Sequence, residues 1–147
     1  MPQLTRRKDT ERPDCWNVYF GDVGVGAIGR RAGVPLHVDQ WEWSCGFYPL
    51  SLRGVSVGGM AQSFEQARDA FGAAWLELQP RIEETDYAEN RRQRAWTAWK
   101  YTMHDASLPP PTQLASGRAQ CFCGVEIDNK GLTITSPPPI WRCNEVC

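Results

Sequence analysis

The stretch Trp41-Glu-Trp-Ser-Cys-Gly-Phe47 decides the fold, because its larger, mostly aromatic side chains alternate with small or polar ones. A period of two is the pattern of a β-strand with one buried face. The same alternation at residues 15–20, a Gly-Asp turn and a glycine-rich apolar segment at residues 23–30 predict a hairpin before it. A short edge strand is expected at residues 55–57. Together these segments predict a three- or four-stranded antiparallel β-meander.

An amphipathic helix is predicted directly after the strands. Ser63-Phe-Glu-Gln66 has the form of a capping box, in which a hydroxyl and an amide satisfy the first N–H groups of a helix. Apolar residues then recur at helical spacing as far as Leu78, so we expect a helix over residues 64–79 that packs on the aromatic face of the sheet. A second, more polar helix is expected from Asp86 onward, and the predicted fold class is α+β.

Composition divides the chain into four predicted parts. Residues 1–14 are charged and without periodicity, which is typical of a flexible arm. The α+β domain covers residues 15–106, a Pro-rich linker covers 107–120, and a Cys-rich tail covers 121–147. Within the tail, two short apolar segments around the turn Asn129-Lys-Gly131 predict a small hairpin that pairs residues 125–128 with 132–135.

Charge and hydropathy favour a cytoplasmic protein. The 16 basic and 17 acidic side chains leave a formal charge of −1, so no global field attracts nucleic acid or an anionic membrane. The N-terminal residues lack the apolar core of a secretory signal, and no apolar run is long enough to span a membrane. Cytoplasmic thiols stay reduced, which favours metal ligation or reduced thiols over disulfides.

Four of the six cysteines lie in the tail as two pairs, Cys121 with Cys123 and Cys143 with Cys147. Two pairs of thiolates form a plausible tetrahedral zinc site. Ordinary reduced thiols and a disulfide or redox pair stay open as alternatives. The Cys121-Phe-Cys-Gly124 segment resembles the opening of short bacterial treble-clef or ribbon-type zinc fingers. That resemblance implies a zinc-binding tail, although no His follows Cys123 to complete the site in the usual way.

The predicted function is a non-enzymatic protein-interaction module whose tail zinc can stabilise. Residues 15–80, with their Trp-rich strands and the Ser63-capped helix, are similar to small uncharacterised bacterial proteins, a resemblance that implies the fold and no activity. Large rings anchor protein interfaces efficiently, and Tyr19, Tyr48 and Trp96 are candidates. The partner is predicted to be a protein, with no small-molecule substrate.

A nucleic-acid-binding protein is the first alternative. Residues 91–101 interleave bases with aromatic rings, so Arg91, Arg92, Arg94 and Lys100 are candidate phosphate contacts. The charge order along this helix is equally explained by the helix dipole. A thiol or metal enzyme at the Cys-rich tail is the second alternative.

Two other patterns receive structural interpretations. Gly24-Val-Gly-Ala-Ile-Gly29 matches a dinucleotide-binding fingerprint, but Pro35 and nearby breakers oppose the helix that the fingerprint needs, so we expect a glycine-rich strand. Cys45 lies on the same strand face as Trp41 and Trp43, which predicts a buried core thiol instead of a nucleophile. No catalytic residue is predicted.

Overall fold

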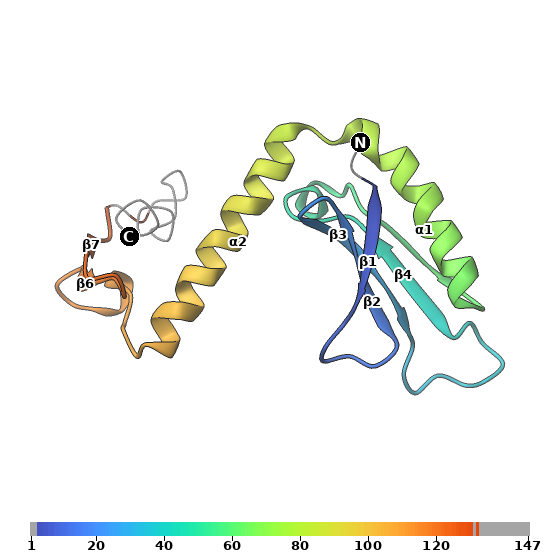
Figure 1. Ribbon diagram of the computed structural model, residues 1–147, viewed down its shortest axis with the longest axis horizontal. Coiled ribbons are helices and arrows are strands. Elements are labelled where there is room, and N and C mark those ends of the chain that lie inside the picture. Colours follow the sequence, from blue (N-terminus) through green and yellow to red (C-terminus); the bar gives the residue numbers. More distant parts are fainter. Residues whose placement is uncertain (1–2, 131, 133–147) are drawn as a thin grey trace. The chain divides into compact units, whose positions relative to one another are not determined.

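The computed structural model describes residues 3–130 and residue 132, and it forms an α+β fold. Five strands make one antiparallel sheet in the order β1-β2-β3-β4-β5 (Figure 1). The predicted meander is confirmed, but it has five strands instead of three or four. The strands are β1 (Leu4–Lys8), β2 (Cys15–Phe20), β3 (Val23–Arg30), β4 (Trp41–Cys45) and β5 (Val57–Ala61).

The first strand corrects the prediction of a flexible arm at residues 1–14, because Leu4–Lys8 pairs along its whole length with β2. Asp9 folds the chain back between the two strands. Its carboxylate accepts the backbone N–H groups of Glu11 and Arg12 and an N–H of the Asn17 side chain. These hydrogen bonds, that from Arg12 first, lower the pKa of Asp9 below its ordinary value of 3.8. The Asp9 carboxylate is therefore ionised at neutral pH.

The glycine-rich segment is strand β3, as predicted, and not a nucleotide loop. Gly26 has a φ of 154°, and a Cβ at this position would clash with the Ser44 carbonyl oxygen and the Phe71 ring. Only glycine lets β3, β4 and the helix above them approach this closely.

Helix α1 (Phe64–Leu78) packs across the aromatic face of the sheet, as predicted. The Ser63 hydroxyl accepts the Gln66 N–H, as predicted, but the Gln66 amide oxygen accepts the N–H of Gln62 instead of that of the cap residue Ser63. The rings of Phe64 and Trp16 lie 5.0 Å apart between centroids. Other ring pairs continue this core: Trp41 with Phe64, Trp43 with Phe71, and Phe20 with Trp75.

The 3-10 helices η1 (Leu50–Arg53) and η2 (Gln79–Arg81) flank this core, and helix α2 (Glu84–Asp105) follows. The Arg53 guanidinium lies 2.9 Å from the Asp86 carboxylate, which also accepts the Glu83 N–H. Burial raises the pKa of Asp86, but the hydrogen bond from Glu83 and the Arg53 charge outweigh it, so the pKa lies below 3.8. The ion pair between Arg53 and Asp86 therefore links η1 to the first turn of α2.

The chain divides into two compact units, an N-terminal unit (Met1–Asn90) and a C-terminal unit (Arg91–Cys147). The boundary falls within α2, whereas the sequence suggested one in a linker at residues 107–120. That segment is ordered: it contains η3 (Pro111–Gln113) and strand β6 (Arg118–Gln120), and Pro111 and Ala119 are buried.

The hairpin of the C-terminal unit differs from the predicted one. Strand β7 (Glu126–Asp128) pairs antiparallel with β6, which places the Cys121-Phe-Cys-Gly124 segment at the turn between them. Of the partner predicted at residues 132–135, only Leu132 lies within the described residues. Neither α1 nor α2, within the described residues, is long and apolar enough to cross a membrane.

Candidate functional site

Cys121 and Cys123 occupy one tight turn at the tip of the β6–β7 hairpin. The Gly124 N–H donates to the Cys121 carbonyl at 2.8 Å, and the Cys121 N–H donates to the Val125 carbonyl at 2.8 Å. Gly124 has a φ of 93°, a conformation that side chains oppose. The glycine therefore closes the turn that carries both thiols, whereas the sequence predicted the hairpin turn at residues 129–131.

The sulfur of Cys121 is held by an aromatic side chain of α2. Trp99 Nε1 lies 3.3 Å from Cys121 Sγ, and both residues are at least 98% buried, with exposed fractions of 1% and 2%. An indole N–H can only donate, so the sulfur is the acceptor. The contact therefore fixes the position of the Cys121 sulfur against α2.

The surroundings of this sulfur are apolar. Trp99, Met103 and Cys121 form the buried centre of a small cluster, and Cys123 is half-buried at its margin. The other side chains packed around it are Trp96, Leu108, Ile127 and Leu132. An apolar shell limits water access and strengthens metal–thiolate bonds.

The residues present fit half of a tetrahedral zinc site. Cys121 and Cys123 can supply two thiolates, and Trp99 supplies an N–H to one of them. Cys143 and Cys147 lie outside the described residues. Among the residues that are described, no three His, Cys, Asp or Glu side chains gather as a metal group. The set of four thiolates stays a prediction.

The four basic residues of the nucleic-acid alternative do not share one face of α2. At about 100° per residue along a helix, Arg91, Arg92, Arg94 and Lys100 point in different directions around the axis. The aromatic rings between them are also occupied. Trp99 is buried, and Trp96 is half-buried and packs edge-on against it with centroids 5.7 Å apart. The ring of Tyr101, next to Lys100, is by contrast 67% exposed, so the nucleic-acid alternative stays a prediction.

The tyrosines proposed as anchors are engaged within the N-terminal unit. The Tyr48 hydroxyl lies 3.3 Å from a carboxylate oxygen of Glu89, to which it donates. The Tyr19 ring lies under the Arg7 guanidinium at 5.0 Å. Both side chains are half-buried, so each presents only part of its ring to a partner.

Cys45 is a core thiol, as predicted. It is 1% exposed, and burial raises its pKa to about 11. At neutral pH this thiol is protonated and a poor nucleophile.

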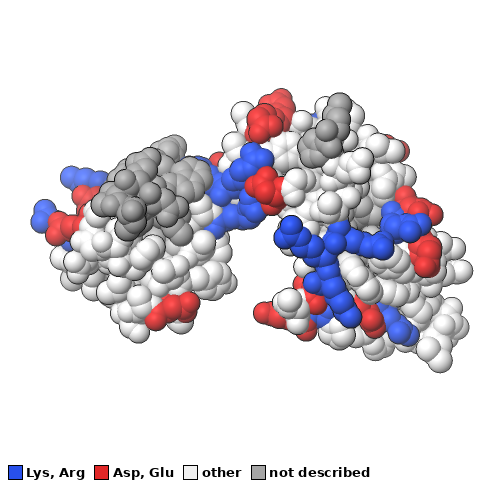
Figure 2. Space-filling view, viewed as in Figure 1, with Lys and Arg blue, Asp and Glu red and all other residues white. Residues whose placement is uncertain are grey.

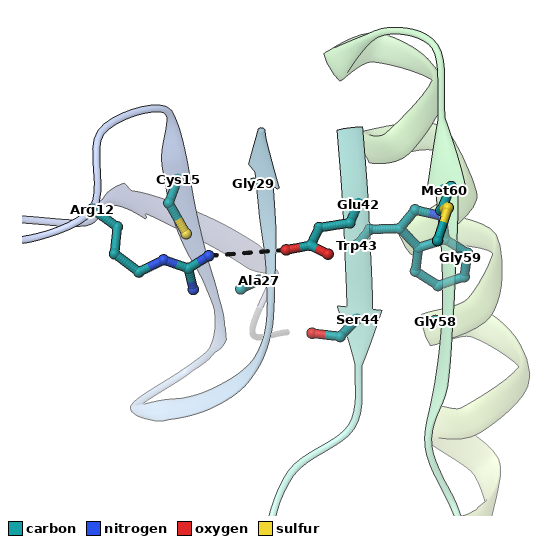
Figure 3. Close-up of a pocket in the computed structure, with 10 residues that line it drawn as sticks. All are labelled: Arg12, Cys15, Ala27, Gly29, Glu42, Trp43, Ser44, Gly58, Gly59 and Met60. Atoms are coloured by element: carbon teal, nitrogen blue, oxygen red, sulfur yellow. Dashed lines mark ion pairs between the residues drawn. The ribbon is translucent and has the colours of Figure 1, made fainter. Parts of the chain in front are cut away.

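A hollow on the sheet face opposite α1 was not predicted from the sequence. Its volume is about 480 Å³, and its floor consists of small residues on adjacent strands, including Ala27, Gly29 and Ser44 (Figure 3). Arg12 and Glu42 face each other across it at 3.9 Å, with both side chains more than half exposed. These two carry the only charges of its lining, which contains no His. The sequence does contain a signal for this hollow, because small residues alternate along the strands on the sheet face opposite α1.

Comparison of the chain with protein-family models, with curated proteins and with solved structures found no match.

Proposed function

We propose that this protein is a non-enzymatic protein-interaction module whose C-terminal unit is stabilised by a structural zinc ion. The ligands are Cys121, Cys123, Cys143 and Cys147. The protein works in the cytoplasm, where thiols remain reduced and available to metal. The zinc ion, when bound, crosslinks two chain segments and takes no part in a reaction.

The hydrogen bond from Trp99 to Cys121 carries the zinc part of the proposal. It holds a buried sulfur as an acceptor inside an apolar cluster, at a turn that delivers a second thiol two residues later. Partners of this kind around a metal ligand orient it and tune its affinity for metal. An ordinary reduced thiol in a core needs no such donor.

Apolar side chains at the same turn support the interaction part. Phe122, between the two cysteines, is 38% exposed, and Val125 beside the turn is 47% exposed. A metal at the turn would hold Phe122 in place and so reduce the entropy lost when a partner covers its ring. The zinc ion thereby prepares the contact surface.

The metal content of protein purified without added zinc tests this proposal. We expect about one zinc per chain, because structural zinc sites bind too tightly to empty during purification. The Cys121→Ser/Cys123→Ser double variant should retain less than about a tenth of that amount. Cys15→Ser is the matched control, since Cys15 is a buried cysteine of the N-terminal unit, and it should keep its zinc. Zinc-free unmutated protein, or full zinc in the double variant, would contradict the proposal.

A further inference from the structure

The edge of the sheet at β1 is open to pairing within the described chain. All five residues of β1 pair with β2 on one side, and no described strand pairs with the other side. Backbone N–H and C=O groups of alternate residues on an edge strand point away from the sheet. They can form the ladder of an added strand.

A groove runs beside this edge, between β1 and α1. Its volume is about 490 Å³. Leu4 and Arg6 line it from β1, and the buried side chains of Val18 and Phe71 contribute to its apolar lining. Gly72 lines it from α1, and a Cβ at Gly72 would meet no atom within 4 Å. The groove can therefore receive side chains from an extended chain next to β1.

The rim of the groove is basic. Arg6, Arg7 and Lys8 are consecutive and exposed on β1, and Figure 2 shows Lys and Arg side chains gathered over this strand. Because side chains alternate along a strand, Arg6 and Lys8 lie on the groove side and Arg7 on the other face of the sheet. The Arg6 guanidinium lies 5.0 Å above the Phe64 ring, and Arg7 lies 5.0 Å above Tyr19. These rings hold the two guanidinium groups in place beside the edge strand.

Helix α1 contributes one further positively charged side chain to the groove. Arg68 lines the groove and is paired with Asp69 at 3.2 Å. The charge at the groove stays positive, because its lining contains Arg6 and Arg68 against Asp69 and Lys8 lies on the same side of β1. Attraction by this charge would select acidic partners and raise their association rate.

We propose that β1 binds an extended acidic segment of a partner protein, which adds to the sheet as a sixth strand. Apolar side chains on alternate residues of that segment enter the groove between β1 and α1, and the carboxylates between them, which lie on the other face of the sheet, pair with Arg7. About five residues match the length of β1. This inference rests on the proposed interaction function and names the partner, but it uses only the N-terminal unit.

Single-stranded RNA is the competing occupant for a basic surface. Its binding requires exposed rings on which bases stack. Two of the rings beside β1, Phe64 and Tyr19, already carry an arginine over one face. The apolar lining of the groove also favours peptide side chains over phosphates.

Fluorescence anisotropy with synthetic probes tests the inference. The probes are a peptide of about ten residues of alternating Glu and Val, the same peptide with Lys for Glu, and an oligouridylate of about the same length. We expect only the acidic peptide to bind the full-length protein. Arg7→Glu should weaken that binding at least about tenfold, because it reverses the charge on the face that the Glu side chains occupy. The control Arg81→Glu, an exposed reversal in η2, should change it less than about twofold.

Gly72→Leu separates groove binding from simple charge attraction. The new side chain fills the groove and leaves every charge in place, so affinity for the acidic peptide should again fall at least about tenfold. Gly72→Ala, which adds one methyl group to open space, serves as the smaller variant if the first misfolds. Unchanged affinity in a folded Gly72→Leu protein would overturn the inference, as would tighter binding of the oligouridylate or no binding of any probe.

The zinc site is tested apart from the groove by the Cys121→Ser/Cys123→Ser variant. It should bind the acidic peptide as the unmutated protein does, because the groove lies in the N-terminal unit. Loss of zinc together with normal peptide binding bears on the metal centre alone. Normal zinc content together with absent peptide binding overturns the groove proposal and leaves the zinc-stabilised module standing.

Discussion

The two units of this chain contain cores of very different size. Among the described residues, the N-terminal unit buries thirteen side chains in one cluster between sheet and helix, whereas the C-terminal unit buries three. A sheet of five strands covered by a helix removes enough apolar surface from water to be stable alone. A short hairpin on the end of a helix does not, and small cores commonly depend on a metal or disulfide. The comparison shows which of the two units the proposed zinc ion would stabilise.

Of all the changes considered, removal of zinc should have the largest effect on the difference in stability between the two units. A structural zinc site contributes roughly 10 kcal/mol or more to the folding of a small domain. With a chelator, amide hydrogen exchange should therefore become fast in β6, β7 and the part of α2 after Asn90. Exchange in β2 to β4 should stay slow. Equal protection of both units with and without chelator would show that the C-terminal unit folds without metal.

Phe71→Ala tests the stability of the core in the N-terminal unit. Phe71 is 2% exposed and packs over Gly26 and Trp43, so its truncation leaves a cavity that costs about 3–5 kcal/mol. Denaturant unfolding followed by Trp fluorescence measures the loss, and zinc content should not change. Leu76→Ala on the same helix is the control, because Leu76 is 71% exposed and should cost less than about 0.5 kcal/mol.

Asp86→Asn should reduce stability by about 2 kcal/mol at neutral pH, because it removes the charge that Arg53 and the Glu83 N–H stabilise. The lowered pKa of Asp86 sets the pH dependence. The stabilisation is fully present above 3.8 and disappears as pH falls through the lower pKa of the folded state. Thermal unfolding curves of variant and unmutated protein should therefore converge as the solution is acidified below about pH 4.

Asp69→Asn is the control for that measurement. Asp69 pairs with Arg68 at 3.2 Å, but both side chains are more than half exposed. An exposed ion pair contributes less than about 1 kcal/mol. A stability loss in Asp69→Asn equal to that in Asp86→Asn would mean that burial of Asp86 does not matter.

The smallest expected effect is that of Trp99→Phe, which keeps a large ring in the cluster and removes the N–H donor. Zinc affinity should fall about tenfold, the lower end for loss of a partner of a metal ligand. Competition with a coloured zinc chelator measures it. Trp96→Phe is the control, since Trp96 packs on Trp99 and its N–H makes no described bond to either cysteine. Equal affinities in the two variants would remove the role of the indole N–H.

Local patterns predicted the central elements well. Strand β4 and helix α1 each bury one face, so their periods of two and of about 3.6 residues are visible in the sequence. Strand β1 was missed because four of its five residues are exposed and no alternation remains. Its pairing depends on the Asp9 turn and on β2, and neither belongs to the strand itself.

The candidate site was predicted in the same uneven way. The closely spaced pair of Cys121 and Cys123 is visible in the sequence. Its place at the turn between β6 and β7 was not predicted, because it depends on the pairing of those two strands. Trp99 as the donor to sulfur was not predicted either, since it lies 22 residues away on α2. The hollow at Arg12 and Glu42 and the groove beside β1 combine residues of several strands and a helix, which no single segment reveals.

The sequence by itself determined the α+β class, the strand at residues 41–45 and the capped helix, because each depends on neighbours within a few positions. Only the tertiary structure decided that β1 is an edge strand, that β6 pairs with β7, and that Trp99 donates to Cys121. These features depend on contacts between distant segments, and their free energy appears only when the chain has folded around them.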